Sequence, residues 1–243
     1  MPRTPSSPVS TLPKKKKPPK KAMSPRTAQL IAVGVVVLFL AAITAILVST
    51  LQSPNTDALP EPTPSGDAQV QRPDSHSLTS PAEPEVTLVE FLDFQCPACA
   101  SAAVAVSQIK AEYGDRVDII VRNFPLTSIH PHAVDAALAF EAAAAQGATV
   151  EMYEALYATQ QQWSAGAGSQ AATFRDLADQ LGLDLAEYDR VVADPATLDR
   201  VALDRADAIG LGLQSTPSFF IDGQLVQISS FDDLRAQIEA KLG

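Results

Sequence analysis

The sequence predicts an α/β domain with an all-helical insertion, preceded by a single N-terminal transmembrane helix. Residues 30–48 contain no charged side chain, which indicates a membrane span. Runs of β-branched and aromatic residues lie near 86–124 and 218–228, on either side of a long stretch with helical periodicity. The predicted order is β-α-β, a helical block, then β-β-α, which is typical of one α/β domain interrupted by helices.

The charges of the 243-residue chain are divided unevenly. Residues 1–29 hold eight Lys or Arg, seven Pro and no acidic residue, so we predict a basic cytoplasmic tail that does not fold. Residues 49–243 hold all 28 acidic residues against ten basic ones. This excess of negative charge argues against nucleic-acid binding by the main domain, because it would repel a phosphate backbone.

Residues 30–48 are predicted to cross the membrane once. Nineteen residues at about 1.5 Å each span roughly 28 Å, close to the thickness of the hydrocarbon layer. Eight positive charges precede the segment and the next follows only at Arg72, so the N-terminus is predicted to be cytoplasmic and residues 49–243 extracytoplasmic. A cleaved signal peptide is the alternative, but no good A-x-A site follows Val48.

The region after the span divides by composition. Residues 49–85 contain seven Pro among Ser, Thr and acidic residues, which predicts a stiff, extended tether. Residues 86–243 then form a domain of 158 residues, long enough for a single hydrophobic core.

The first half of this domain predicts a strand-helix-strand unit. Val86–Phe94 and Val117–Phe124 are apolar runs typical of buried strands, and Pro97–Tyr113 is a helix that ends at Gly114.

The second half predicts the helical insertion, about 130–210, and a closing hairpin. Helical periodicity extends from Pro131 to about Gly210 in several pieces. Two short strands, Ser218–Ile221 and Leu225–Ile228, flank Asp222-Gly223, which is a strong two-residue turn signal. A last amphipathic helix runs from a Ser230 cap to Leu242.

Cys96 and Cys99 are the only cysteines and the main candidate functional residues. Cys96 is predicted at a helix N-terminus, where free N–H groups and the helix dipole stabilise a thiolate. Pro97 suits the first helical position, and Cys99 lies one turn later on the same side. The pattern therefore predicts an exposed, low-pKa nucleophile with a buried resolving partner. Outside the membrane, such a pair can cycle through mixed disulfides with substrate proteins.

Three other interpretations of the cysteine pair remain open at this point. A structural disulfide closing so small a loop would add little stability. A zinc site would need two further ligands, for which His130 and His132 are the only plausible source. The third alternative is a pair of inert core cysteines. The redox interpretation needs no metal and no cofactor beyond the Cys96–Cys99 disulfide.

Three motifs resemble the DsbA-like thiol-disulfide oxidoreductases of the thioredoxin superfamily, particularly the membrane-anchored Gram-positive type. They are FLDFQCPACA, RNFPLTSIHPHA and STPSFFIDGQ, in the order of that family, and the resemblance covers essentially all of 86–243. It implies a thioredoxin fold with a helical insertion after the second strand. It also implies disulfide formation in exported proteins and re-oxidation by a quinone-linked membrane partner.

The resemblance assigns roles to individual residues. Cys96 matches the nucleophile and Cys99 the resolving thiol. Pro217 matches a cis-proline that packs against the disulfide, and Thr216 would present its backbone to a substrate strand. The cis assignment rests on the resemblance, because only about one X-Pro bond in twenty is cis.

Glu90 matches the buried acid that carries the Cys99 proton. A strand Glu pointing to solvent is the alternative, and Asp93 is a competing candidate for the proton role.

The active-site dipeptide, Pro97-Ala98, departs from the strongly oxidising members, which carry His where this chain has Ala98. We therefore expect a Cys96 pKa above the value of about 3.5 of the extreme oxidant, and a less oxidising potential. Thr216 also replaces a valine-type residue. Both departures leave the direction of electron flow open.

The remaining aromatic and His residues are expected to be structural. His130 and His132 are predicted to cap the first helix of the insertion, whereas Tyr153, Tyr157 and Trp163 are predicted to lie in the core.

Together these patterns predict an extracytoplasmic thiol-disulfide oxidoreductase that forms disulfides in exported polypeptides. A reductase or isomerase of the same fold is the first alternative, and a non-catalytic binding or sensor ectodomain is the second. An external electron partner is required because there is no second cysteine pair, and a monomer is expected.

Overall fold

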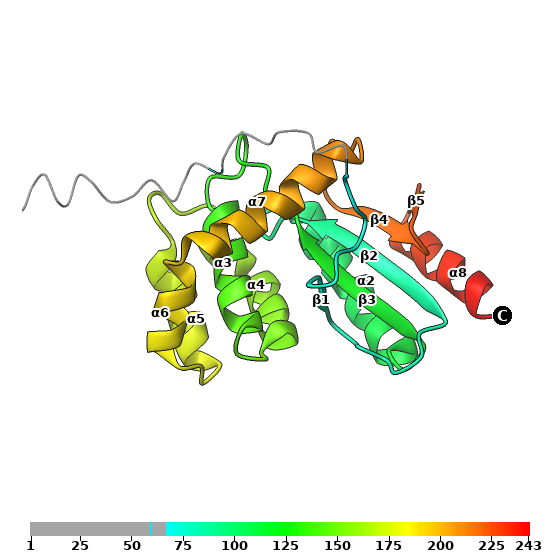
Figure 1. The fold of residues 1–243 in the computed structure, drawn as a ribbon, viewed down its shortest axis with the longest axis horizontal. Coiled ribbons are helices and arrows are strands. Elements are labelled where there is room, and N and C mark those ends of the chain that lie inside the picture. The colour runs from blue at the N-terminus through cyan, green and yellow to red at the C-terminus, as the bar shows by residue number, and fades with distance from the viewer. Residues whose placement is uncertain (1–58, 60–66) are drawn as a thin grey trace, which may run out of the picture. The chain divides into compact units, whose positions relative to one another are not determined.

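A mixed five-stranded sheet forms the centre of the described part of the chain (Figure 1). The computed structural model describes residue 59 and residues 67–243. The sheet order is β1-β3-β2-β4-β5, with β2 parallel to β3 and antiparallel to β4. The strands are β1 (His76–Ser77), β2 (Val86–Leu92), β3 (Val117–Asn123), β4 (Ser218–Ile221) and β5 (Gln224–Val226).

Both faces of the central strands are buried, and alternate residues of β2 therefore belong to different clusters. Leu88 and Leu92 pack in the cluster that contains the buried side chains of α2 (Pro97–Tyr113) and α8 (Phe231–Leu242). Val89 and Phe91 pack on the other face, against Ala208 near the end of α7 (Pro195–Gly210). The helix α2 connects the parallel pair β2 and β3, as a parallel connection requires.

The predicted helical insertion is confirmed between β3 and β4. It consists of α3 (Ala133–Ala144), α4 (Thr149–Trp163), α5 (Ala171–Gln180), α6 (Leu185–Val192) and α7. Asp184 and Asp194 cap α6 and α7 by accepting hydrogen bonds from first-turn N–H groups. The fold is therefore the expected sheet with an all-helical insertion, and α4 of the insertion packs beside α2.

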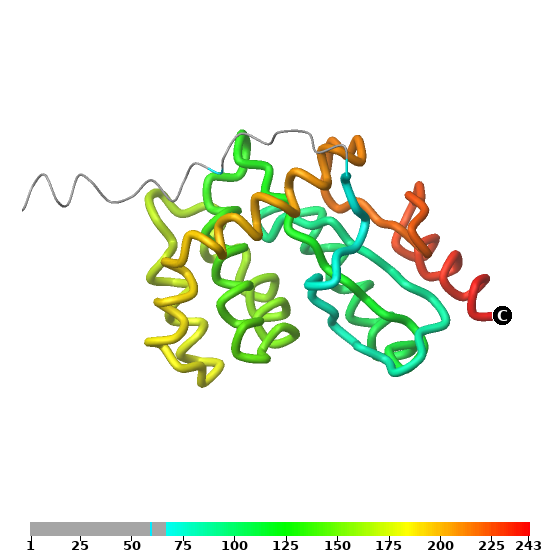
Figure 2. The backbone as a smooth tube through the Cα atoms, viewed as in Figure 1, coloured from blue at the N-terminus to red at the C-terminus, as the bar shows by residue number. Residues whose placement is uncertain are grey.

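Residues 67–85 do not form the extended tether that their composition predicts. The strand β1 pairs antiparallel with β3, and Leu78 is buried in the core. In Figure 2 the cyan segment lies along the sheet before the chain enters β2. The packed domain therefore begins well before residue 86, because this segment completes the edge of the sheet beside β3.

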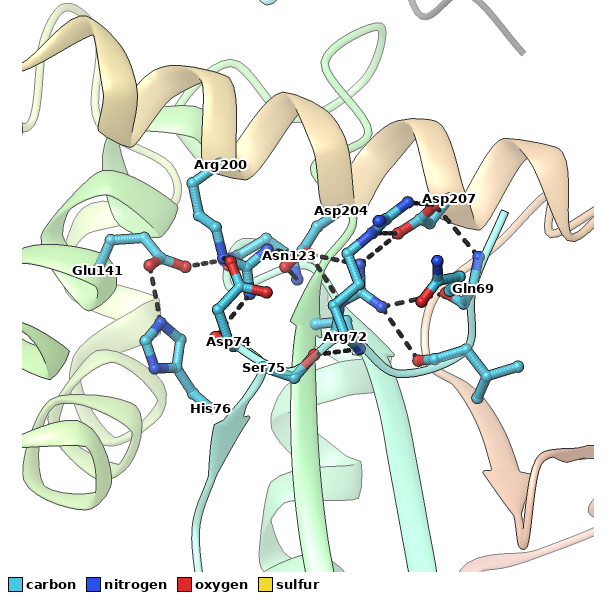
Figure 3. Close-up of polar contacts among 12 residues, drawn as sticks. Gln69, Arg72, Asp74, Ser75, His76, Asn123, Glu141, Arg200, Asp204 and Asp207 are labelled. Atoms are coloured by element: carbon cyan, nitrogen blue, oxygen red, sulfur yellow. Dashed lines mark hydrogen bonds and ion pairs between the residues drawn. The ribbon is translucent and has the colours of Figure 1, made fainter. Parts of the chain in front are cut away.

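A buried group of charges, here named the Arg122 cluster (Arg72, Arg122, Asp204 and Asp207), fastens this segment (Figure 3). The fully buried Arg122 pairs with Asp204 at 2.5 Å and Asp207 at 2.6 Å. Its Nη1 also donates to the backbone oxygens of Gln69 and Val70, both at 3.1 Å. Arg72 donates two hydrogen bonds to Asp207, at 2.5 and 2.7 Å.

The second hairpin strand is Gln224–Val226 rather than Leu225–Ile228, because the Asp222-Gly223 turn is tight and pairs Ile221 directly with Gln224. The basic tail and the transmembrane helix fall outside the described residues. Within the part that the structure describes, none of the helices is long and apolar enough to cross a bilayer.

Candidate active site

Cys96 is the N-cap residue of α2, immediately after β2. Its backbone is extended (φ −71°, ψ 124°), and its carbonyl oxygen accepts the N–H of Ala100 at 3.2 Å. Pro97 occupies the first turn, where no N–H partner is needed. The Cys96 side chain is therefore held beside the unpaired N–H groups that begin the helix.

The two cysteines are free thiols in this structure, and both are buried, so the exposure that the sequence predicts for Cys96 is wrong. Their environments nevertheless differ. The Cys99 thiol, together with the N–H groups of Cys99 and Ala98, lowers the pKa of Cys96 to about 5. Burial raises the pKa of Cys99, which is completely inaccessible, and the neighbouring Cys96 raises it further. Cys96 is thus a thiolate at neutral pH, and its pKa lies above the value of about 3.5 of an extreme oxidant.

The loop before β4 lies directly against Cys96. The Sγ atom of Cys96 is 3.5 Å from the backbone oxygen of Thr216. The Thr216-Pro217 peptide bond is cis, which confirms the conformation that was expected from the resemblance. The Thr216 hydroxyl is buried without a hydrogen-bond partner, so it is available to a sulfur at this position.

Glu90 is buried rather than directed to solvent, so the solvent-facing alternative is wrong. It alternates with Leu88 and Leu92 and therefore shares their face of β2, the face covered by α2. Burial raises the pKa of Glu90 to about 8. Its Oε2 accepts a hydrogen bond from the Tyr153 hydroxyl at 3.4 Å, and its Oε1 has no partner.

Asp93, the competing candidate, is fully engaged in shaping the loop. Its carboxylate accepts the N–H of Gln95 and the N–H of Leu126, both at 2.8 Å. Its Oδ2 also lies 2.7 Å from Nδ1 of His130. These contacts tie the loop before Cys96 to the loop after β3, so Glu90 fits the proton role better than Asp93 does.

The two histidines are bonded to protein groups other than the thiols. His130 pairs with Asp93, whereas His132 Nε2 is 2.8 Å from the backbone oxygen of Gly166. His132 is the N-cap residue of α3, which confirms its predicted place at the start of the insertion, although its side chain makes no cap hydrogen bond and His130 is not the N-cap residue. Because both histidines contact groups other than the cysteines, the zinc alternative loses the two further ligands that it needs.

Sequence reasoning missed Gln160. From α4, its Nε2 donates to the backbone oxygens of Phe94 and Cys96, at 2.8 and 2.9 Å. This amide fixes the backbone around the nucleophile from inside the insertion. The only signal in the sequence is that Gln160 shares a helical face with Tyr153 and Trp163, which are buried as predicted.

Among curated proteins the chain is similar to Na(+)/H(+) antiporters named NhaA. It is 35% identical over 175 residues to NhaA 1 of Mycobacterium sp. (strain KMS), covering 70% of this chain and 27% of that protein. It is 39% identical over 153 residues to NhaA 3 of Salinispora tropica, covering 63% of this chain and 22% of that protein. The chain thus spans about a quarter of the length of these relatives.

Solved structures give a closer match in length. A thioredoxin-like oxidoreductase from Silicibacter pomeroyi DSS-3 superposes with a TM-score of 0.56 and 26% identity, covering 72% of this chain and 96% of its own. DsbA2 of Pseudomonas aeruginosa superposes with a TM-score of 0.56 and 24% identity, covering 70% of this chain and 96% of its own. The α-DsbA1 protein of Wolbachia pipientis superposes with a TM-score of 0.58 and 21% identity, covering 70% of this chain and 90% of its own.

A family model described as Thioredoxin matches residues 81–240, which include the cysteine pair, the whole insertion and the cis-proline loop. The chain therefore belongs to the thioredoxin family, and it shares its fold with the DsbA proteins named above.

Proposed function

We propose that the chain is an extracytoplasmic thiol-disulfide oxidoreductase that forms disulfides in exported polypeptides. The observation that carries this proposal is the pairing of a Cys96 of pKa about 5 with a buried, protonated Cys99 at the start of α2. A low-pKa thiol is a good leaving group, so a disulfide that contains Cys96 is readily donated to another thiol. The contact between Cys96 and Thr216 places this sulfur beside a backbone that can hold a peptide.

The proposed reaction begins with the oxidised protein. A substrate thiolate attacks Sγ of Cys96, the Cys96–Cys99 bond breaks, and Cys99 leaves as a thiolate that takes a proton from the Glu90 carboxyl. A second substrate thiolate then attacks the substrate sulfur of the mixed disulfide and releases the Cys96 thiolate. The substrate loses two electrons and two protons, and the cysteine pair is reduced.

A surface cavity supports the proposed peptide contact. It has a volume of about 350 Å³ and lies between the loop that carries Pro217 and the edge strand β5. Ser215, Pro217 and Leu225 are among its lining residues. A bound strand there could pair with the Thr216 backbone while its cysteine faces Cys96.

The reaction also needs a cellular location and an electron-transfer partner. Eight positive charges before residues 30–48 support a single-pass anchor with the catalytic domain outside the membrane. Because the chain has only two cysteines, re-oxidation needs an external electron acceptor, for which we propose a quinone-linked membrane partner. We propose that the protein acts as a monomer.

Reductase or isomerase activity is the second candidate. Ala98 in the active-site dipeptide carries no group that could stabilise the Cys96 thiolate further, which favours a less oxidising pair. A non-catalytic sensor domain does not account for the low Cys96 pKa. Ion antiport is not carried over from the NhaA relatives, because the chain spans only about a quarter of their length.

Oxidative refolding tests the proposal. The full chain, oxidised beforehand, is mixed with a reduced secreted protein whose activity depends on its disulfides, and recovery of that activity is followed. We expect stoichiometric disulfide transfer, none with Cys96→Ser, and normal transfer with Ser101→Ala, an exposed hydroxyl on the same helix. Equal recovery with Cys96→Ser and the unaltered chain would refute the proposed function.

A further inference from the structure

Among the described residues, the carboxyl group of Glu90 has a single hydrogen-bond partner, and that partner comes from the insertion. Within the sheet, Glu90 lies between Val121 of β3 and Phe219 of β4, which are both apolar. The hydroxyl of Tyr153 from α4 is 3.4 Å from Oε2, whereas Oε1 is buried and unpartnered. The two oxygens of the carboxyl group therefore have different environments.

Tyr153 packs among aromatic neighbours. Its ring centroid lies 6.2 Å from that of Phe94 and 5.1 Å from that of Tyr157, both in edge-to-face arrangements. Only 2% of the residue is exposed. Burial also raises the pKa of Tyr153, so its hydroxyl keeps its proton and can serve as a donor.

No other titratable group competes for this contact in the part of the chain that the structure describes. From α2 and its N-cap, the groups that act on Glu90 and Tyr153 are the thiols Cys99 and Cys96, which are the reacting groups themselves. On α4, the neighbouring Glu154 raises the pKa of Tyr153 slightly further, but its carboxylate pairs with Lys110 at the surface. The Tyr157 hydroxyl is directed to the backbone oxygen of Asp93 at 3.5 Å. The buried residues of α8 are Leu234 and Ile238, which carry no charge.

We propose that Tyr153 is a positioning residue for proton transfer between Cys99 and Glu90. The hydroxyl occupies Oε2 and leaves Oε1 as the oxygen that exchanges the proton with Cys99. In the direction that closes the Cys96–Cys99 bond, the Cys99 proton passes to Glu90 and the Cys99 sulfur attacks Sγ of Cys96 in a mixed disulfide. One S–S bond forms, the bond to the bound partner breaks, and the partner leaves as a thiolate.

This inference rests on the proposed function and adds a role for the insertion in it. Because α4 supplies the hydroxyl, the insertion contributes to the proton step as well as to the outline of the active site. Removing the hydroxyl should make the Glu90 carboxylate harder to form. Because Glu90 accepts a proton only as a carboxylate, the closing step should then require a higher pH.

The test follows formation of the Cys96–Cys99 disulfide in the full chain, starting from the reduced protein. Oxidised glutathione is added over a range of pH values, the reaction is quenched with acid, and chromatography separates the mixed disulfide from the closed Cys96–Cys99 disulfide. We expect Tyr153→Phe to move the pH midpoint of the closing step upward by about half to one unit. Tyr157→Phe is the matched control, because it removes the neighbouring hydroxyl that does not contact Glu90, and its midpoint should not move.

Two further variants make the result decisive. Tyr153→Met also lacks the hydroxyl, so it must shift the midpoint in the same direction even if the Phe variant fails to fold. In a Glu90→Gln background, Tyr153→Phe should have no further effect on the pH profile. Coincident profiles for Tyr153→Phe, Tyr157→Phe and the unaltered chain would overturn the inference, whereas failure of the unaltered chain to form any mixed disulfide would instead overturn the proposed function.

Discussion

The sulfur of Cys96 lies 3.5 Å from the backbone oxygen of Thr216, a residue 120 positions later in the chain. The fold creates this contact because β4, which follows the Thr216-Pro217 bond, pairs with β2, which precedes Cys96. The nucleophile and the proposed peptide-binding loop therefore lie at adjacent ends of two paired strands.

The Thr216 hydroxyl should stabilise the Cys96 thiolate. It is buried, has no other partner and acts to lower the pKa of Cys96. Thr216→Val keeps the side-chain shape and removes this donor, so we expect the pKa of Cys96 to rise by about half to one unit. Titration of the thiolate absorbance measures it, with Ser218→Ala as control because the Ser218 hydroxyl bonds to Ser215. An unchanged pKa in Thr216→Val would contradict this role.

The two cysteines should have separable roles. Cys96→Ser removes the sulfur that a substrate attacks, so all exchange should stop. Cys99→Ser leaves the Cys96 thiolate without a resolving partner, so mixed disulfides with substrate should accumulate. Non-reducing electrophoresis after acid quenching detects these adducts. If Cys99→Ser accumulates none of them, the assignment of Cys99 as resolving thiol is wrong.

Glu90 should make the folded state less stable as the pH rises. Its pKa is raised from 4.5 to about 8 by burial, so the folded chain binds a proton that the unfolded chain releases between these values. Stability therefore falls with increasing pH across this window. Glu90→Gln should flatten the slope and stabilise the domain at pH 8 by on the order of 2–4 kcal/mol.

Urea unfolding at pH 5 and pH 8 measures this difference. Glu154→Gln on the surface of α4 is the control, because Glu154 is half-exposed and its carboxylate pairs with Lys110 at the surface. A Glu90→Gln variant with the same pH slope as the unaltered chain would show that Glu90 does not carry the buried proton.

The Arg122 cluster should stabilise the segment before β2. Arg122 is inaccessible and pairs with both Asp204 and Asp207, so Arg122→Met removes the one cation that joins the two buried carboxylates and leaves them only Arg200 and Arg72 as ion-pair partners within the described residues. We expect a loss of about 3–5 kcal/mol in the free energy of unfolding. Arg175→Met, which breaks the exposed pair with Asp189, should leave the melting temperature nearly unchanged. Similar melting temperatures for the two variants would contradict a fastening role for the cluster.

The local elements of this fold could be predicted from the sequence because their signals are local. Pro97 after a buried strand marks the start of α2, and Asp222-Gly223 marks the hairpin turn. The cysteine pair follows from its position at that helix start. The cis conformation before Pro217 required the resemblance to a family, since spacing alone does not specify it.

Other features depend on contacts that leave no local pattern. The strand β1 consists of His76 and Ser77, which are too few and too polar to indicate a strand, and β3 alone determines their pairing. Gln160 reaches the Cys96 backbone only because α4 packs beside α2. The burial of Glu90 was ambiguous because a strand covered on both faces lacks the alternation that would reveal its orientation.

The reduction potential of the Cys96–Cys99 pair tests the central claim most directly. The full chain is equilibrated with glutathione buffers of known ratio, and the fraction of closed disulfide is measured after acid quenching. A protein that donates disulfides should give a value near or above roughly −180 mV, which is the result we predict. A value near roughly −270 mV, as in thioredoxin-like reductants, would contradict disulfide formation as the function and reverse the direction of electron flow.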